Sequence, residues 1–288
     1  MWFSYETTEG EQLEVRMGVS FVSVENARLN LEAEQQERSF DDIRAAARRS
    51  WNDDLGRIRV EGGTDAQKKV FYTGLYHALI HPNVLSDVNG EYPAMESAEI
   101  RTAEGNRYTV FSLWDTYRNL HQLMTLVYPE RQLEMVRSMI GMYKEWGWLP
   151  KWELYGRETF TMEGDPAIPV IVDTWMKGLR DFDMDAAYEA MRKSATTPGA
   201  QNRMRPDIDP YVEKGYVPLG FYARDLSGDN SVSHALEYYI ADHACRCWPI
   251  RSAAGRTRRC SGTVRSAIRT TTAPNRALSV RSPGRAVS

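Results

Sequence analysis

The sequence predicts an all-α main domain over residues 25–245, preceded by a short β segment over residues 1–24. Near residue 25 the spacing of apolar residues changes from every second position, typical of strands, to about 3.6, typical of helices, and about eight helical segments follow. The 288 residues are 42% hydrophobic, enough for one globular core. No apolar run reaches the roughly 18–20 residues of a membrane span, and the opening residues lack the pattern of a secretory signal.

The first 24 residues carry the strand pattern. Gln12–Met17 alternates polar and apolar residues, and Val19–Val24 is rich in β-branched residues after Gly18. Two or three strands cannot bury a face alone. We therefore interpret residues 1–24 as the edge of a larger sheet or the remnant of a missing domain.

The helical part has local start signals. Ser39 and Asp42 resemble a capping box, Thr64 and Gln67 form a second one, and Pro129 suits the first turn of a helix. Apolar residues share one face in each of the first two of these helices: Phe40, Ile43, Ala47 and Trp51, then Phe71, Leu75, Ala78 and Leu79. Further helices are expected from Ser112 to Leu126 and over residues 129–146, 166–181, 184–195 and 232–245, whereas residues 83–110 are predicted to be irregular.

The charge distribution divides the chain near Cys245. Residues 1–245 hold all 39 acidic residues and carry a net charge of -13, whereas residues 246–288 hold ten Arg, no Lys and no acid. This tail has two interpretations: a disordered basic arm for nucleic acid or anionic lipid, or an out-of-frame translation. We favour the second, because the change falls inside a predicted helix and natural basic arms usually mix Lys with Arg.

Two stretches concentrate aromatic and acidic residues, as carbohydrate clefts do. In the first, Trp114, Asp115 and Arg118 stand close together, and from spacing alone an i,i+3 ion pair beside a core Trp is the simpler interpretation. The second stretch, residues 146–167, holds three Trp and four carboxylates, Glu153, Glu158, Glu163 and Asp165. These acids suggest the paired carboxylates of a glycosidase, but from the residues alone a solvated acidic loop is the favoured interpretation.

Other reactive side chains do not form a known motif. His77 and His81 have i,i+4 spacing without a third ligand, which favours structural histidines. Cys245, Cys247 and Cys260 match neither a zinc-binding pattern nor a disulfide framework. No phosphate-binding glycine loop and no nucleophile elbow occurs.

Several blocks, in order, resemble the glycoside hydrolase family 92 α-mannosidases. They include Gly18–Ser23, Phe71–His77, Phe111–Arg118, Leu149–Leu154, Met162–Asp165 and Leu236–Tyr238. The resemblance implies an exo-acting, calcium-dependent, inverting α-mannosidase that trims N-glycans or mannans, with a β-sandwich followed by an (α/α)6 barrel. It places Trp114, Asp115 and Arg118 in the pocket for the terminal mannose and Glu158 near the same cleft, where Glu158 is a weak catalytic candidate.

The departures from the family pattern lead to further expectations. The family's acid block, Glu-Gly-Asn-x-Trp-Gln, and its base block, Gly-Asn-x-Asp, are absent, and residues 1–24 would be only the last strands of the sandwich. We therefore expect a truncated, partial (α/α)6 domain with impaired turnover. The alternatives are a mannose-binding fragment without turnover and, less favoured, nucleic-acid binding through the tail. Family members are often exported; the sequence itself leaves cellular location, calcium ligands and oligomeric state open.

Overall fold

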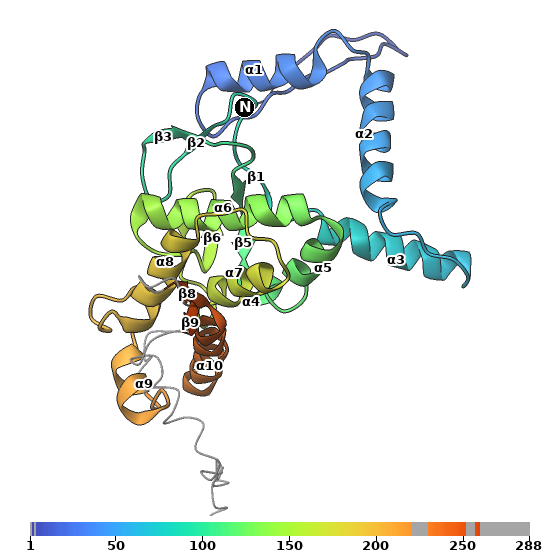
Figure 1. Cartoon of the computed structure of the whole chain (residues 1–288). Coiled ribbons are helices and arrows are strands. Elements are labelled where there is room, and N and C mark those ends of the chain that lie inside the picture. Colours follow the sequence, from blue (N-terminus) through green and yellow to red (C-terminus); the bar gives the residue numbers. More distant parts are fainter. Residues whose placement is uncertain (1, 3, 221–229, 252–256, 260–288) are drawn as a thin grey trace, which may run out of the picture.

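The computed structural model describes residue 2 and residues 4–220, 230–251 and 257–259. This part of the chain is mostly helical, as the sequence predicts. Figure 1 shows α6 near the centre, α2 and α3 as an arm on one side, and α9 and α10 at the far end. None of the helices described has the length and apolar character needed to cross a lipid bilayer. Closure of the helices into an (α/α)6 ring stays a prediction.

The prediction of strands before residue 24 was wrong. The described residues there form no strand, and Val15 and Met17 are 78% and 73% exposed. A strand needs partners and a covered face, and no strand of the described residues pairs with this segment. Side chains anchor it instead: Ser20 Oγ donates to Asp87 Oδ2 at 2.6 Å, and Arg16 Nη1 donates to the carbonyl of Gln36 at 2.8 Å. A sandwich origin for residues 1–24 stays a prediction.

The first three helices are α1 (Val24–Gln35), α2 (Phe40–Leu55) and α3 (Asp65–Ala78). Both predicted capping boxes are confirmed, at Ser39 before α2 and Thr64 before α3. The apolar face predicted for α2 is not covered, because Phe40 at its start is 65% exposed. Trp51, at the other end of this face, packs against Tyr76 on α3, with ring centroids 4.5 Å apart. Helix α2 therefore forms part of a projecting arm.

Residues 83–110 contain short strands where the sequence predicted irregular chain. Strands β1 (Asn83–Val84) and β4 (Tyr108–Thr109) pair antiparallel, as do β2 (Glu91–Pro93) and β3 (Ile100–Thr102). Strands of two or three residues are too short for an alternating pattern to be visible in the sequence. The amide of Asn26 on α1 donates to Asp87 at 2.8 Å and to Glu91 at 2.9 Å, which ties this region to the first helix.

The single helix predicted from Ser112 to Leu126 is divided into α4 (Leu113–Thr116) and α5 (Leu120–Val127). Ser112 makes no capping hydrogen bond through its side chain, contrary to expectation. The interruption falls where Tyr117 and Arg118 both turn to a carboxylate on α10, Glu237. By contrast, α6 (Pro129–Trp146) has the predicted bounds and ends at Gly147, whose φ of 92° suits a glycine cap.

The main core lies between α6, α7 (Ala167–Met176), α8 (Met184–Thr196) and α10 (Ser231–Cys247), close to the predicted ranges. Helix α9 (Ile208–Lys214) was not predicted, because seven residues give little periodicity. Helix α10 continues to Cys247, so the change in composition near Cys245 falls inside this helix. Trp248, 2% exposed, extends the core beyond its end. Strand β8 (Pro249–Arg251) pairs with β9 (Thr257–Arg259), and the rest of the predicted basic tail, including Cys260, lies outside the described residues.

A buried ion network joins the loop before α7 to α10. The guanidinium of Arg205 is completely buried and donates to Asp165 Oδ2 at 3.1 Å and to Asp242 Oδ1 at 2.7 Å. Tyr211 Oη on α9 donates to the other oxygen of Asp242 at 2.9 Å. Burial lowers the pKa of Arg205, but the charges of Asp242 and Asp165 more than offset this and raise the pKa well above its ordinary value. Arg205 thus stays charged in the interior.

We expect Arg205→Met to destabilise the protein strongly. Removing the guanidinium leaves two buried carboxylates without their partner, a change that typically costs about 3–5 kcal/mol. Urea denaturation followed by circular dichroism measures the free energy of unfolding. Arg44→Met is the control, because Arg44 is 72% exposed and its ion pair with Asp41 lies on the surface. Equal, small losses in the two variants would contradict the structural importance of this network.

Candidate functional site

A small sheet brings the two aromatic, acidic stretches of the sequence together. Strand β5 (Phe111–Ser112) pairs antiparallel with β6 (Trp152–Leu154), which in turn pairs with β7 (Arg157–Glu158). Ser112 is opposite Trp152, and the backbone N–H of Leu113 donates to the carbonyl of Lys151 at 3.2 Å. Helix α4, which carries Trp114 and Asp115, therefore begins directly beside the second stretch.

Trp114 and Arg118 form a stacked pair at the surface. The Arg118 guanidinium lies 4.8 Å from the Trp114 ring centroid and 4.9 Å from that of Tyr117, and its Nε donates to the Trp114 carbonyl at 3.1 Å. Its Nη2 is 2.9 Å from Glu237 Oε1. The geometric partner of Arg118 is therefore Glu237, and the i,i+3 pair with Asp115 that the sequence suggested is not formed.

Asp115 is exposed, and its protein contact is a short hydrogen bond from the hydroxyl of Ser112. A carboxylate has about four acceptor positions, so most of this group's capacity faces solvent. Together, an indole ring, an accessible carboxylate and a fixed guanidinium can stack on a sugar ring and bind its hydroxyl groups. We call Trp114, Asp115, Tyr117, Arg118 and Glu237 the Trp114 cluster.

Glu237 is the cluster residue that the analysis of individual motifs missed. It lies on α10, is only 10% exposed, and also accepts a hydrogen bond from Tyr117 Oη at 2.7 Å. Burial, followed by the hydrogen bond and charge of Glu237, raises the pKa of Tyr117 to about 12, so its phenol remains a donor near neutral pH. The only sequence signal for Glu237 was its place in the family-like block Leu236–Tyr238.

Gly164 sets the distance between the acidic loop and α10. Its φ is 77°, and a Cβ at this position would lie 2.5 Å from the Cβ of Glu237. The neighbouring Glu163 accepts a short hydrogen bond from Ser233, also on α10. The loop and the helix therefore touch over the residues that flank the Trp114 cluster.

The carboxylates of Glu153 and Glu158 are used for internal hydrogen bonds. Glu158 is buried and accepts from the backbone N–H groups of Lys151, Trp152 and Phe160 at 2.7, 2.9 and 2.9 Å. Glu153 is fully buried and accepts from Thr109, Val110 and Gly156 at 2.7, 3.0 and 2.6 Å, in a setting where burial raises its pKa. Both contact sets indicate structural roles for these two acids.

Asp165, the last of the four acids, is also buried. It accepts from Arg205 and, through a short hydrogen bond, from Ser194. In the part of the chain that the structure describes, no three carboxylate, histidine or cysteine side chains converge on a point where a cation would bind. Helix α3 ends at Ala78, so His77 and His81 do not share a helix face, contrary to expectation, and His81 Nδ1 lies 3.1 Å from Asn83 Oδ1.

His121 supports the cluster from the interior. Its ring is 1% exposed, with Nδ1 3.0 Å from Gln132 Oε1 on α6 and Nε2 3.2 Å from the hydroxyl of Thr116 at the end of α4. Gln132 in turn donates to Thr174 on α7 at 2.9 Å. Burial lowers the pKa of His121 to about 4. The short helix that carries Trp114 and Asp115 is thus connected to the core through a neutral imidazole.

Comparison with known proteins identifies relatives of this chain. The model of the glycosyl hydrolase family 92 catalytic domain matches residues 26–251. A GH92 α-mannosidase of Bacteroides thetaiotaomicron, also solved in complex with mannoimidazole, is 36% identical with a TM-score of 0.70, covering 78% of this chain and 29% of its own. The GH92 inverting mannosidase of Bacteroides thetaiotaomicron VPI-5482 is 32% identical with a TM-score of 0.71. That match covers 79% of this chain and 31% of the mannosidase.

A fungal relative extends this comparison. The uncharacterized secreted glycosidase of Arthroderma benhamiae is 27% identical over 241 residues, which are 81% of this chain and 27% of that protein. The chain thus spans less than a third of the length of these three relatives.

We expect Gly164→Ala to destabilise the protein more than Gly178→Ala. Both glycines have positive φ, 77° and 93°, but a Cβ at Gly178 meets nothing within 4 Å, whereas one at Gly164 collides with Glu237. The excess cost at Gly164 should be about 1–3 kcal/mol, typical of overpacking. Urea unfolding of both variants gives the difference, and an equal loss would show that the close approach is readily relaxed.

The burial of His121 predicts a pH dependence of stability. Between about pH 6.5 and pH 4 the unfolded chain binds a proton at this residue and the folded chain does not, so the free energy of unfolding should fall as the pH is lowered. The contribution is on the order of 3 kcal/mol. His121→Gln should remove it, whereas His243→Gln, at an exposed position, should not. Parallel pH profiles for wild type and His121→Gln would contradict this prediction.

Proposed function

The chain belongs to glycosyl hydrolase family 92, and from this we propose that it binds the terminal α-linked mannose of N-glycans or mannans as part of an inverting α-mannosidase. The residues proposed to bind mannose are Trp114, Asp115 and Arg118. The observation that carries the proposal is the Trp114 cluster, in which Glu237 fixes the guanidinium beside an exposed carboxylate. The α-mannosidase relatives, one of them bound to mannoimidazole, support mannose as the ligand.

The proposed roles follow from the chemistry of the three side chains. The Asp115 carboxylate accepts from two adjacent sugar hydroxyls, since its oxygens are accessible and acceptor-only when ionised. The Trp114 ring offers an apolar face for the C–H groups of the pyranose. Arg118, stacked on Trp114 and paired with Glu237, is held in a single orientation and donates to a third oxygen.

The contacts of Glu153 and Glu158 leave neither acid placed for proton transfer to a substrate. An inverting glycosidase uses a general acid and a general base about 6.5–9.5 Å apart. Glu158, the weak catalytic candidate from the sequence, is buried and accepts from three backbone N–H groups, and Glu153 is also buried and accepts from three donors. We therefore propose that the described residues contribute mannose binding, with the acid and base supplied from outside them.

Calcium stays an expectation from the family resemblance. Among the described residues no three carboxylate, histidine or cysteine side chains converge on a cation position, and no step of the proposed function is assigned to the ion. Location is likewise proposed from relatives: a secreted glycosidase of Arthroderma benhamiae resembles this chain, which supports an exported protein.

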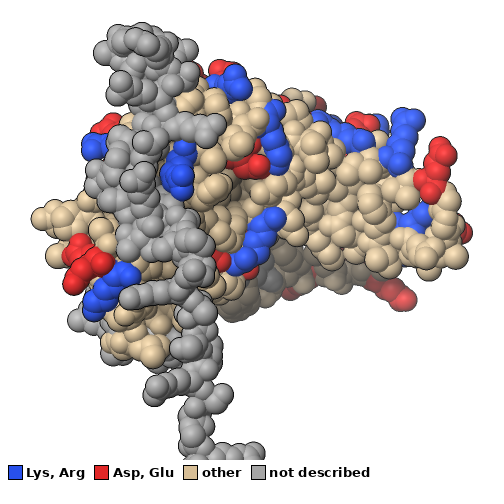
Figure 2. All heavy atoms as spheres, turned by 60° about the horizontal axis from the view of Figure 1, so that its bottom comes forward, with Lys and Arg blue, Asp and Glu red and all other residues tan. Residues whose placement is uncertain are grey.

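Two alternative functions lead to different measurements. A mannose-binding fragment without turnover would use the same three residues, and turnover of an aryl α-mannoside by the purified chain distinguishes it from an enzyme. Nucleic-acid binding rests on the basic tail, most of which lies outside the described residues. On the face in Figure 2, the described Lys and Arg side chains alternate with Asp and Glu and form no continuous basic stripe of the kind nucleic acids require.

We expect Asp115→Ala to weaken binding of methyl α-mannoside at least about tenfold, because the loss of hydrogen bonds to a charged acceptor costs about 1.5–3 kcal/mol each. Isothermal titration calorimetry or ligand-observed NMR measures the affinity. Asp181→Ala is the matched control, since the Asp181 side chain is 86% exposed. Unchanged affinity in Asp115→Ala, with wild-type binding intact, would contradict the proposed site.

A further inference from the structure

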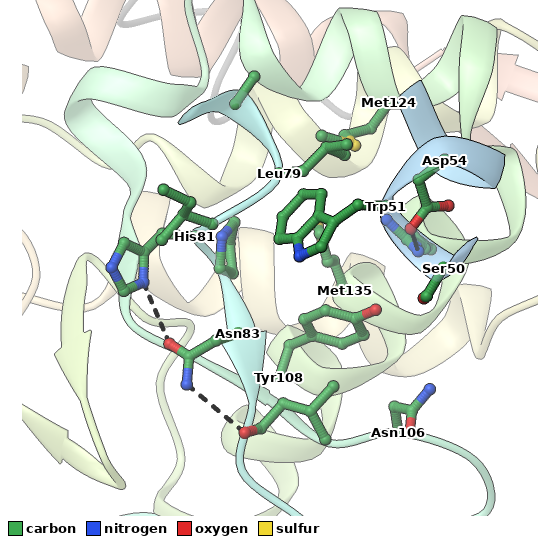
Figure 3. Close-up of a pocket in the computed structure, with 15 residues that line it drawn as sticks. Ser50, Trp51, Asp54, Leu79, His81, Asn83, Asn106, Tyr108, Met124 and Met135 are labelled. Carbon is green, nitrogen blue, oxygen red and sulfur yellow. Dashed lines mark hydrogen bonds and ion pairs between the residues drawn. The ribbon is translucent and has the colours of Figure 1, made fainter. Parts of the chain in front are cut away.

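A cavity separate from the Trp114 cluster lies between the projecting arm and the main domain. It has a volume of about 450 Å³ and opens between α2, the chain after α3, strands β1 and β4, and helices α5 and α6. Figure 3 shows Trp51 of α2 among the residues that line it, with Leu79 and Met124 to one side and Tyr108 to the other. We call this the Trp51 pocket. None of its lining residues belongs to the Trp114 cluster.

The pocket has an aromatic wall of defined orientation. The Trp51 indole is half-buried and packs against Tyr76, with ring centroids 4.5 Å apart. Tyr108 is 6% exposed, and burial raises the pKa of its phenol to about 12, so the phenol stays neutral at physiological pH. Rings held in this way provide apolar faces for the C–H groups of a ligand at low entropic cost.

Polar side chains surround this wall. Asn83 and Asn106 bring amide groups to the pocket, and His81 holds the oxygen of the Asn83 amide at 3.1 Å. The nitrogen of that amide makes only a long contact of 3.5 Å to the carbonyl of Val84, so it can donate to a ligand. Ligand sites typically combine an apolar, aromatic lining with a few such polar groups, in cavities of about 300–1,000 Å³.

The charges in the pocket favour a neutral ligand. Arg131, the lining residue with a permanent positive charge, pairs with Asp54 at 2.6 Å and stacks over Tyr128. An anion would have to compete with Asp54 for this guanidinium, and a purely apolar ligand would leave the Asn83 amide nitrogen with only its long contact to Val84. A neutral molecule with one apolar face and several hydroxyl groups satisfies both parts of the lining.

From these contacts we infer that the Trp51 pocket is a second carbohydrate site, which takes one neutral hexose ring of a glycan. The ring stacks on Trp51 and exchanges hydrogen bonds with Asn83 and with the Asp54–Arg131 pair. None of the contacts from which this site is inferred involves the Trp114 cluster. Only the choice of mannose as the probe rests on the proposed function.

The test uses the full chain labelled with 5-fluorotryptophan, so that each tryptophan reports separately by ¹⁹F NMR. Trp51→Phe and Trp114→Phe assign the two resonances of interest. Methyl α-mannoside is titrated to millimolar concentration, then α-1,2-mannobiose, and sodium sulfate serves as the anionic probe. We expect the Trp51 resonance to shift with either sugar but not with sulfate. Tighter binding of the disaccharide would indicate a glycan unit, and equal binding a single hexose.

Asn83→Ala should lower the sugar affinity measured at the Trp51 resonance about tenfold, the usual effect of losing a hydrogen bond. The affinity measured at the Trp114 resonance should stay unchanged. Asn89→Ala, at an exposed position outside the pocket, is the control. If the Trp114 resonance shifts with sugar and the Trp51 resonance does not, the second site is overturned. If the Trp51 resonance shifts with sulfate alone, the pocket is an anion site and the proposal is likewise overturned. A Trp51 response without a Trp114 response would support the pocket and overturn the proposed mannose site.

Discussion

The buried guanidinium of Arg205 is the constraint on which the arrangement of the candidate site depends. A charge that is out of contact with water must be paired, and its partners are Asp165, in the loop before α7, and Asp242 on α10. The loop and the helix are therefore fixed against each other. One residue before Asp165, Gly164 touches Glu237 of the same helix. The position of Glu237 in turn determines where Arg118 lies, so a buried ion pair sets the geometry of a surface cluster.

The acidic residues near this network show how the same side chain serves different purposes. The backbone between β6 and α7 is regular only over the short strand β7, and Tyr155, Phe160 and Met162 on either side of it all have positive φ. Such a backbone cannot pair its own N–H groups, which need acceptors when buried. Glu153 and Glu158 supply those acceptors. Glu153 and Glu158, which lie on the short strands β6 and β7, thus satisfy backbone N–H groups that the sheet does not pair, and the accessible carboxylate belongs to Asp115 on the neighbouring helix.

Local features of the fold could be predicted, whereas features that depend on distant partners could not. The capping boxes at Ser39 and Thr64 involve residues three positions apart, and both are present. Residues 2–24 have the composition of strands, but none of the strands described elsewhere in the structure pairs with them. The break after Thr116 falls where Tyr117 and Arg118 contact Glu237, which no pattern around residue 116 reveals. Family-like blocks did select Trp114, Asp115 and Arg118, but their spacing suggested an ion pair within the block, and the observed partner comes from α10.

The hydrogen bond from Tyr117 to Glu237 joins residues 120 positions apart. Proteins emerge from the ribosome N-terminal end first, and contacts between distant parts of a chain form slowly. During synthesis, Trp114, Tyr117 and Arg118 therefore exist for a long interval without the helix that orients them, while the early capped helices can already form. The cluster is completed only after α10 has been synthesised and packs against α7. A nascent chain that stalls before α10 would already hold the side chains proposed to bind sugar, but not their fixed geometry.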